Sequence, residues 1–222
     1  MSGITFNLII KYYPYLYHMA EGDSWESIEA KGLLSTSALL DLFEINATRR
    51  FAIESCHRPD SVVIEHPRYG RAVIRDQKPM RESALVKCLD GVTPRRWYKF
   101  LNKRVFLWAT AHRLESLLSA RAYRKMKHVV LTVDTEKLLA NYADKVLLSP
   151  INSGSTIYRP APRNLEMFQP MESYPFEERK RKRGIPNAIA EFAFDYAIPD
   201  IRKYVVRVER RRGRRVLEVV WK

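Results

Sequence analysis

The stretch from Ala190 to Ile198, which reads AEFAFDYAI, constrains the fold of this chain more than any other segment. Its residues alternate, so that bulky apolar side chains share one face. The other face carries two acids separated by alanines, Glu191, Ala193, Asp195 and Ala197. A period of two over this length predicts a β-strand that packs its apolar face on a core. The small side chains beside Glu191 indicate that this face leaves room for a ligand.

The rest of the chain mixes strands and helices without a regular βαβ repeat. Hairpins are expected at 61–76 and at the C-terminal end, where 204–209 and 216–221 flank a basic turn. A long loop is expected from 150 to about 175, and 149–156 within it is a candidate for close approach to a ligand. We predict one α+β domain over residues 1–222, with mainly antiparallel split sheets. The expected strands are 15–19, 104–109, 128–134 and 144–150, and the expected helices lie within 22–32, 35–45, 47–55, 77–91, 93–103, 110–121 and 135–143.

The chain is strongly basic, with a formal net charge of +14 over 222 residues. Much of the excess positive charge lies in two runs, at 178–184 and 207–215. A high net charge indicates the kind of partner that a protein binds, and says little about its fold. Nucleic acid is the favoured partner. A solvated basic surface without a partner is an alternative, and a membrane surface is disfavoured because the runs do not lie on an amphipathic helix. The residues expected to bind nucleic acid are Arg179, Lys180, Arg181, Lys182 and Arg183.

Several functional classes are disfavoured by missing motifs. The sequence has no G-x-G-x-x-G, no P-loop motif and no G-x-S-x-G. Two cysteines and nearby histidines have spacings that fit no zinc pattern, so we expect no metal. The start lacks the features of a signal peptide, and no segment approaches about 20 apolar residues. These features predict a cytoplasmic protein with free thiols and no membrane partner.

Three segments occur in an order that resembles the ADP-ribosyltransferases, and DarT-type DNA ADP-ribosyltransferase toxins in particular. The first segment has a strand with His18, a short helix and then Gly-Leu-Leu-Ser. The second is a strand with aromatic residues followed by a capped helix. The third is a basic run that leads into Ala-Glu-Phe. In order they are LYHMAEGDSWESIEAKGLLS, RVFLWATAHRLESLL and RKRKRGIPNAIAEFAFDYAIPDIRKYVVRVE. The chain departs from the family at Ala20, where a Thr is usual, and in FLWATAH, which replaces a Pro-rich aromatic pattern.

The resemblance implies a site that binds NAD as a substrate. Glu191 would be the catalytic carboxylate at the ribose next to nicotinamide, where it stabilises positive charge at C1′ and accepts a proton. Arg75 is the second catalytic candidate, on the pyrophosphate or the acceptor. The residues expected to contact NAD are His18, Ser35, Thr36, Trp108 and Gln77.

Each of these residues also has a structural interpretation. Glu191 and Arg75 can be exposed charged residues, and His18 can be a half-buried strand histidine. The hydroxyls of Ser35 and Thr36 suit a helix cap as well as a ligand. Trp108 can stack on nicotinamide or belong to the core with its neighbour Phe106.

The sequence therefore predicts an NAD-dependent ADP-ribosyltransferase that modifies nucleic acid, with DNA favoured over RNA. By analogy it would be a bacterial toxin or defence effector with a neutralising antitoxin partner. The alternatives are an inactive nucleic-acid-binding domain of the same fold, and a transferase that modifies protein or RNA or hydrolyses NAD.

Overall fold

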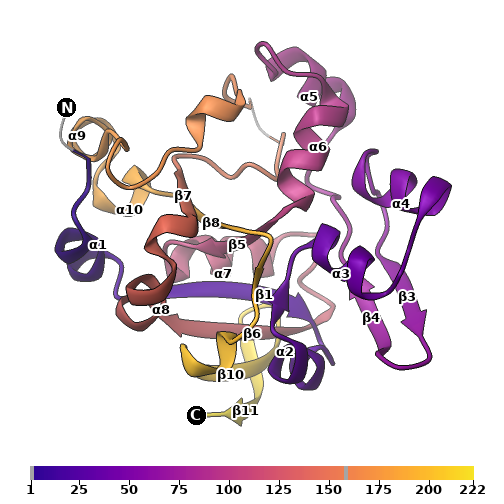
Figure 1. The fold of residues 1–222 in the computed structure, drawn as a ribbon. Coiled ribbons are helices and arrows are strands. Elements are labelled where there is room, and N and C mark those ends of the chain that lie inside the picture. The colour runs from indigo at the N-terminus through magenta and orange to yellow at the C-terminus, as the bar shows by residue number, and fades with distance from the viewer. Residues whose placement is uncertain (1–2, 158–159) are drawn as a thin grey trace.

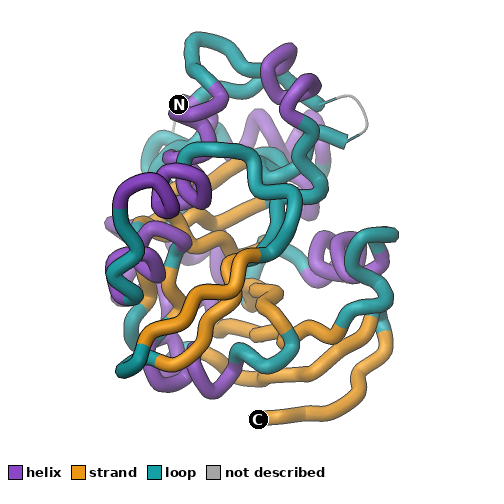
Figure 2. The backbone as a smooth tube through the Cα atoms, turned by 90° about the vertical axis from the view of Figure 1, so that its right-hand side faces the viewer, coloured by secondary structure: helices purple, strands orange, loops and turns teal. Residues whose placement is uncertain are grey.

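Seven strands form one antiparallel sheet that runs through the molecule (Figure 1). The computed structural model describes residues 3–157 and 160–222. The strand order is β11-β10-β6-β1-β5-β8-β7, and β2–β9 and β3–β4 form two small antiparallel sheets. In Figure 2 the C-terminal strand follows the lower edge of the sheet. The strands are β1 Tyr15–Glu21, β2 Leu33–Leu34, β3 Val62–His66, β4 Gly70–Ile74, β5 Arg104–Trp108, β6 Lys127–Asp134, β7 Val146–Ser149, β8 Glu191–Asp195, β9 Ala197–Ile198, β10 Val205–Arg212 and β11 Arg215–Trp221.

Helices cover the sheet and form the top of the molecule (Figure 1). Several helices begin at a capping residue. In α6, for example, the Thr93 hydroxyl accepts from the Arg96 N–H, and Pro94 is the first helical residue. No helix in 3–157 or 160–222 is long and apolar enough to cross a membrane. The α-helices are α1 Phe6–Tyr12, α2 Trp25–Lys31, α3 Thr36–Leu42, α4 Ala47–Glu54, α5 Glu82–Cys88, α6 Pro94–Asn102, α7 Ala111–Ser119, α8 Thr135–Tyr142, α9 Phe176–Arg183 and α10 Ile185–Ala188, and the short 3₁₀ turns are Ala143–Lys145, Leu165–Met167 and Ile201–Lys203.

The main sheet divides between β1 and β5. All seven residues of β1 pair with β6, but only Tyr17 pairs with β5, opposite Trp108. Beyond that pair the two strands separate, and the freed edge of β1 faces the inside of the molecule. The α+β class with antiparallel, split sheets is confirmed, and the fork between β1 and β5 is where the candidate site lies.

A second, smaller layer faces this fork. Helix α4 and the β3–β4 hairpin stand together at the right of Figure 1 and share a core with α3 that includes Leu40, Phe43 and Ile64. Gly32 ends α2 with φ of +88°, and a Cβ there would lie 2.4 Å from Pro199. This close approach lets β2 pair with β9, so α3 begins next to the end of β8.

The strand at 190–198 differs in two ways from its prediction. It breaks at Tyr196, which has φ of +59°, and continues as the short β9. Its small face is also buried at Ala193, which packs in a cluster with Trp97 and Phe168. The alanine therefore makes room for aromatic side chains of the core, and the ligand space that we expected there is absent beside Ala193.

Two parts of the chain form helices that the sequence pattern did not predict. Thr5 caps α1, whose residues have no clear 3.6 period over so short a length. The basic run at 178–184 belongs to α9 and its end, followed at once by α10. Two acids in the first turn of α9 and bases in its last turn favour this helix through the helix dipole.

Candidate active site

A cavity of about 360 Å³ fills the fork between β1 and β5. This volume is within the range of small-molecule sites. All seven residues predicted to act on NAD line it, on two sides. On one side, which we call the strand wall, are His18, Trp108 and Glu191. On the other side, the hairpin wall, are Ser35, Thr36, Arg75 and Gln77.

Strand register places Trp108 and Glu191 of the strand wall, whereas His18 follows Tyr17 and enters the cavity where β1 leaves β5. Trp108 pairs with Tyr17 of β1 on one side and with Glu191 of β8 on the other. Residues directly opposite each other in antiparallel strands project from the same face of the sheet. Glu191 in turn pairs with Ser149, so a row of side chains crosses four strands. Trp108 is half-buried in this row, and it both lines the cavity and packs on the cluster beneath α7.

Glu191 is more deeply buried than Asp76, the other buried acid that lines the cavity, with 3% of its surface exposed. Both of its carboxylate oxygens accept from the Ser153 N–H, at 3.2 and 3.1 Å. Burial raises the pKa of this carboxyl to about 7, although the Ser153 hydrogen bond and the charges of Arg113 and Arg163 oppose the rise. A carboxyl that titrates near neutral pH is suited to exchange a proton with a substrate.

His18 is held on β1 with its ring in the fork. Its Nδ1 lies 2.9 Å from the carbonyl oxygen of Phe106. A carbonyl can only accept, so Nδ1 carries the proton and Nε2 is left as an acceptor. Burial lowers the pKa of His18 to about 4, and the nearby Arg75 charge adds to this shift. The imidazole is therefore neutral at physiological pH, and it can accept a hydrogen bond from a hydroxyl group.

Arg75 follows β4 and reaches across the fork to β1. Its Nη1 donates to the Met19 carbonyl at 3.1 Å, and the guanidinium lies 4.9 Å from the centre of the Tyr123 ring. Burial lowers the pKa of Arg75, but an arginine remains charged at physiological pH. A guanidinium has five N–H donors in a planar fork, which suits bidentate contact with phosphate. Arg75 is therefore a half-buried cation of the cavity and not an exposed residue of the hairpin end.

The other hairpin-wall residues have structural partners. The Ser35 hydroxyl accepts from the Ala38 N–H at 3.1 Å and caps α3. Thr36 follows as the first helical residue and is half-buried at the cavity. The Oε1 atom of Gln77 accepts from the Arg58 N–H at 3.0 Å, which fixes the segment that carries Arg75. Of this group, Thr36 has the hydroxyl with the most freedom to contact a ligand.

The second acid of the strand has a different environment. Asp195 lies at the opposite end of β8, with 65% of its side chain exposed and an ion pair of 3.8 Å to Arg104. It does not line the cavity. Of the two acids on this face, Glu191 alone is a candidate for catalysis.

The five basic residues predicted to bind nucleic acid lie on α9 and do not line the cavity. Lys180 and Lys182 pair with Glu177 and Glu178 in the first turn of the same helix. Arg183 donates to the Pro150 carbonyl at 3.3 Å, so the C-terminal end of α9 adjoins the loop that covers Glu191. The binding role of these residues stays a prediction.

Three residues near Glu191 have roles that the sequence did not predict, although Ser153 lies in 149–156, the segment expected to approach a ligand. Ser153 supplies its backbone donor, and Arg113 and Arg163 supply opposing charge. The sequence did contain an indication of a special role for Arg113. A cation in the first turn of a helix is disfavoured by the helix dipole, and the first turn of α7 contains Arg113 and no acid. Within the described ranges, no cluster of three or more His, Cys, Asp or Glu residues is placed to hold a metal ion.

Comparisons with known proteins give a family but no established activity. No curated protein has a significant sequence match to this chain. A solved structure, Thermosipho africanus DarTG in complex with ADP-ribose, aligns with 88% of this chain at 17% identity and a TM-score of 0.42. The aligned part is 43% of that chain, so this protein spans less than half of its length. Residues 14–205, which include both walls of the cavity, match a family of unknown function, DUF7002, and the chain belongs to that family.

Proposed function

We propose that this protein is an NAD-dependent ADP-ribosyltransferase that transfers ADP-ribose to nucleic acid. The observation that carries the proposal is the meeting of His18, Trp108 and Glu191 in one fork of the sheet, with the Glu191 pKa raised to about 7. The sequence segments that resemble ADP-ribosyltransferases supply these same three residues.

The reaction breaks the bond between C1′ of the ribose and the ring nitrogen of nicotinamide. The electron pair of that bond goes to the ring, which becomes neutral, and positive charge develops at C1′ and the ring oxygen of the ribose. An ionised Glu191 stabilises this charge and holds the neighbouring 2′-hydroxyl. When an acceptor nitrogen or oxygen attacks C1′, the proton that it loses passes to Glu191 or to solvent.

The neighbouring residues have complementary roles in this proposal. The half-buried Trp108 offers an aromatic face on which nicotinamide can stack. Nε2 of the neutral His18 accepts from a ribose hydroxyl, since Nδ1 is held by Phe106. The guanidinium of Arg75 has donors left for the pyrophosphate. Together they would hold the two halves of NAD on either side of the bond that breaks.

The deciding experiment follows the label from NAD labelled in its adenylate part. The purified protein is incubated with single-stranded and double-stranded DNA, RNA or a protein mixture, and released nicotinamide is measured in parallel. We expect label on an oligonucleotide, with DNA preferred, and an equal amount of free nicotinamide. Glu191→Gln should abolish both signals, whereas Asp195→Asn on the same strand should not.

Other outcomes separate the alternatives. Label on protein alone, or release of free ADP-ribose without any labelled acceptor, would replace nucleic acid as the acceptor but keep the NAD chemistry. Oligonucleotide binding without nicotinamide release under any condition would identify an inactive binding domain and overturn the proposal.

A role as a bacterial toxin or defence effector follows if DNA is the acceptor, because ADP-ribose on DNA bases obstructs replication. Induced expression of the wild-type chain in a bacterial host should then stop growth, and Glu191→Gln expressed at the same level should not. Equal growth of both cultures would contradict the toxin role. A neutralising partner, expected from the same analogy, would be a protein that removes ADP-ribose or blocks the cavity.

A further inference from the structure

Three arginines gather outside the cavity, on the far side of the loop that covers Glu191. Arg113 lies in the first turn of α7, and Arg179 and Arg183 lie one turn apart on α9. Burial raises the pKa of the Tyr174 hydroxyl, and the charges of all three arginines oppose that rise. The guanidinium of Arg179 lies 5.4 Å from the centre of the Tyr174 ring.

Two of these arginines line a hollow of about 470 Å³ with Pro150, Ile151 and Asn187. Arg113 donates to the Asn187 side-chain carbonyl at 3.1 Å, and Arg183 donates to the Pro150 carbonyl at 3.3 Å. No carboxylate is among the residues that line this hollow. The charged side chains that line the hollow are therefore all positive.

The guanidinium groups also have donors without partners. The Nε atoms of Arg113 and Arg179 are buried, and neither makes a hydrogen bond within 3–157 or 160–222. A buried donor that lacks a partner is destabilising by about 1–3 kcal/mol, more when the group is charged. An anion in the hollow would compensate the charges of Arg113 and Arg183, the two arginines that line it, and offer acceptors to their guanidinium groups.

The hollow and the cavity lie on two sides of the loop after β7; Glu191 lines the cavity and not the hollow. Strand β5 pairs Trp108 with Glu191 and then leads into α7, which carries Arg113. Strand β7 pairs Ser149 with Glu191 and then leads into Pro150 and Ile151. The loop after β7 thus lines the hollow with its first residues and the cavity with Ser153, so it separates the two spaces.

We propose that the hollow at Arg113, Arg183 and Asn187 binds a phosphodiester group of the acceptor strand, an inference that rests on the proposed transfer to nucleic acid. Attack on C1′ comes from the side opposite the leaving nicotinamide, so the acceptor needs an entrance other than the space that holds NAD. The hollow lies across the loop whose Ser153 binds Glu191, so a strand bound there would lie next to the site on a side separate from the cavity. A nucleic-acid strand fits better than an acidic peptide, because the exposed Arg181 and Lys182 of α9 extend the positive surface next to Arg183, and a nucleic-acid backbone carries a phosphate at every nucleotide.

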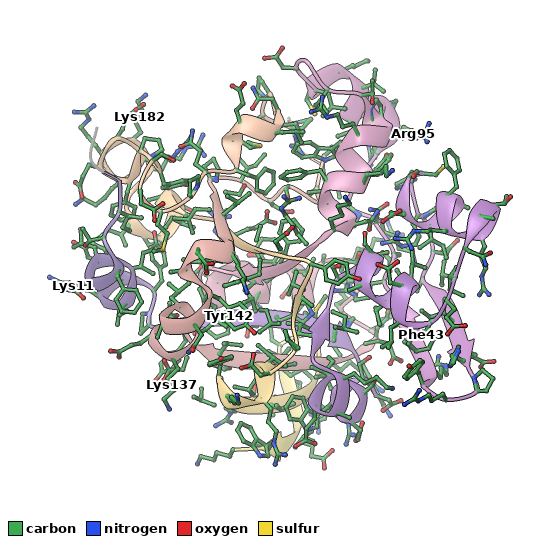
Figure 3. All side chains as sticks on the ribbon, viewed as in Figure 1. Lys11, Phe43, Arg95, Lys137, Tyr142 and Lys182 are labelled. Atoms are coloured by element: carbon green, nitrogen blue, oxygen red, sulfur yellow. The ribbon has the colours of Figure 1, made fainter. Side chains whose placement is uncertain are left out.

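The test measures oligonucleotide binding by fluorescence anisotropy in the absence of NAD, with Arg183→Gln as the variant. Lys137→Gln on α8 is the matched control, since it also removes one positive charge from an exposed side chain. Figure 3 shows Lys137 at the lower left and Lys182 of α9 at the upper left, and Lys137 is not among the residues that line the hollow. Thermal melts of both variants check the fold.

We expect Arg183→Gln to raise the Kd for the oligonucleotide by roughly tenfold or more and Lys137→Gln by less than about twofold. The slope of log Kd against log salt should fall by roughly 0.7–1 for Arg183→Gln, as one phosphate contact is lost. Arg113→Gln, assayed the same way, should weaken binding at least as much. Equal effects of the Arg183 and Lys137 variants would overturn the proposal and indicate a diffuse basic surface. Competition by a polyglutamate peptide at concentrations equal to those of the oligonucleotide would also overturn it, in favour of an acidic protein ligand.

Nicotinamide release without any acceptor distinguishes this proposal from the proposed function. If the wild type cleaves NAD but Arg183→Gln binds the oligonucleotide normally, only the hollow assignment fails. If Arg183→Gln loses binding but no protein cleaves NAD, the hollow binds nucleic acid and the transferase proposal fails.

Discussion

The two walls of the cavity present similar side chains to the same space, but they differ in what those side chains already do. On the strand wall, the Nδ1 of His18 is held by a backbone carbonyl and Glu191 by a backbone N–H, and both retain a free acceptor. On the hairpin wall, the Ser35 hydroxyl caps a helix and Gln77 binds a backbone N–H. Arg75 there donates to the carbonyl of Met19.

This difference follows from the backbone of each wall. Most N–H and C=O groups of the strands are paired in the sheet ladder; at the fork the Phe106 carbonyl accepts from His18 Nδ1, which leaves Nε2 free for a ligand. The hairpin wall is built from a helix start and an irregular segment, whose backbone groups need side chains as partners. We therefore expect the residues of the strand wall to catalyse the cleavage of NAD, and those of the hairpin wall to shape the cavity and bind NAD. Four experiments test this division.

The largest effect should come from the acid of the strand wall. Glu191→Gln keeps the size of the side chain but removes the charge and the proton acceptor. We expect the rate of NAD cleavage to fall by roughly 10²–10⁴-fold, as is typical for loss of a general acid or base. Nicotinamide release measured by liquid chromatography gives the rate, with Asp195→Asn as the control. A rate within threefold of the wild type would remove Glu191 from the mechanism and, with it, the assignment of chemistry to the strand wall.

The raised pKa of Glu191 also predicts how stability depends on pH. In the unfolded chain this carboxyl loses its proton near pH 4.5, whereas in the folded protein it keeps the proton up to about pH 7. The folded state binds more protons between these values, so Glu191 makes the protein less stable as pH rises from about 4.5 to 7. The shift corresponds to about 3 kcal/mol.

Glu191→Gln removes this dependence, because glutamine does not titrate. Urea unfolding at pH 4.5, 6 and 8 should therefore show the variant gaining stability relative to the wild type up to about pH 7, with no further gain above it. A difference in the free energy of unfolding that stays constant from pH 4.5 to 8 would contradict this prediction. It would show that burial does not raise the pKa of Glu191 in the folded protein.

A smaller effect is expected from the cation of the hairpin wall. Arg75→Lys keeps the charge but loses the planar fork, so one ammonium group cannot contact Met19, stack on Tyr123 and bind two phosphate oxygens. The KM for NAD should rise roughly tenfold while kcat changes by less than about threefold, since hydrogen bonds to charged groups contribute about 1.5–3 kcal/mol. Arg68→Lys, at the exposed turn of the same hairpin, is the control. A fall in kcat with an unchanged KM would show that Arg75 acts in catalysis, and would contradict the assignment of catalysis to the strand wall alone.

The sequence predicted the strand wall better than the environment of its residues. Period two located β8, and the order of segments brought His18, Trp108 and Glu191 to one site. The pattern did not predict how deeply each residue is buried. Trp97 and Phe168, from distant parts of the chain, cover the face of the strand at Ala193. Alternation shows which side chains share a face, but long-range packing decides whether that face meets solvent, ligand or core.

The hairpin wall shows the opposite limit. Capping rules predicted the Ser35 helix start, and turn residues predicted the β3–β4 hairpin. Ser35, Thr36 and Arg75 were also proposed as ligand contacts, because a hydroxyl or a guanidinium has the same donors in a structural role and in a binding role. Only the positions of Ala38, Arg58 and Met19 show which donors and acceptors are already used. Helices α1, α9 and α10 were missed because they are short and lack a strong apolar period.

The smallest effect should separate two adjacent hydroxyls on the hairpin wall. Ser35→Ala removes the cap of α3 and should lower the free energy of unfolding by about 1 kcal/mol, measured by urea denaturation, with little change in the KM for NAD. Thr36→Val keeps the shape of the side chain but removes its hydroxyl, so it should leave stability within about 0.5 kcal/mol and raise the KM a few-fold. If Ser35→Ala instead raises the KM and leaves stability unchanged, its hydroxyl serves the ligand in solution. The hairpin wall would then bind NAD with the same groups that the structure shows holding the backbone, and substrate would have to displace the cap of α3 in order to bind.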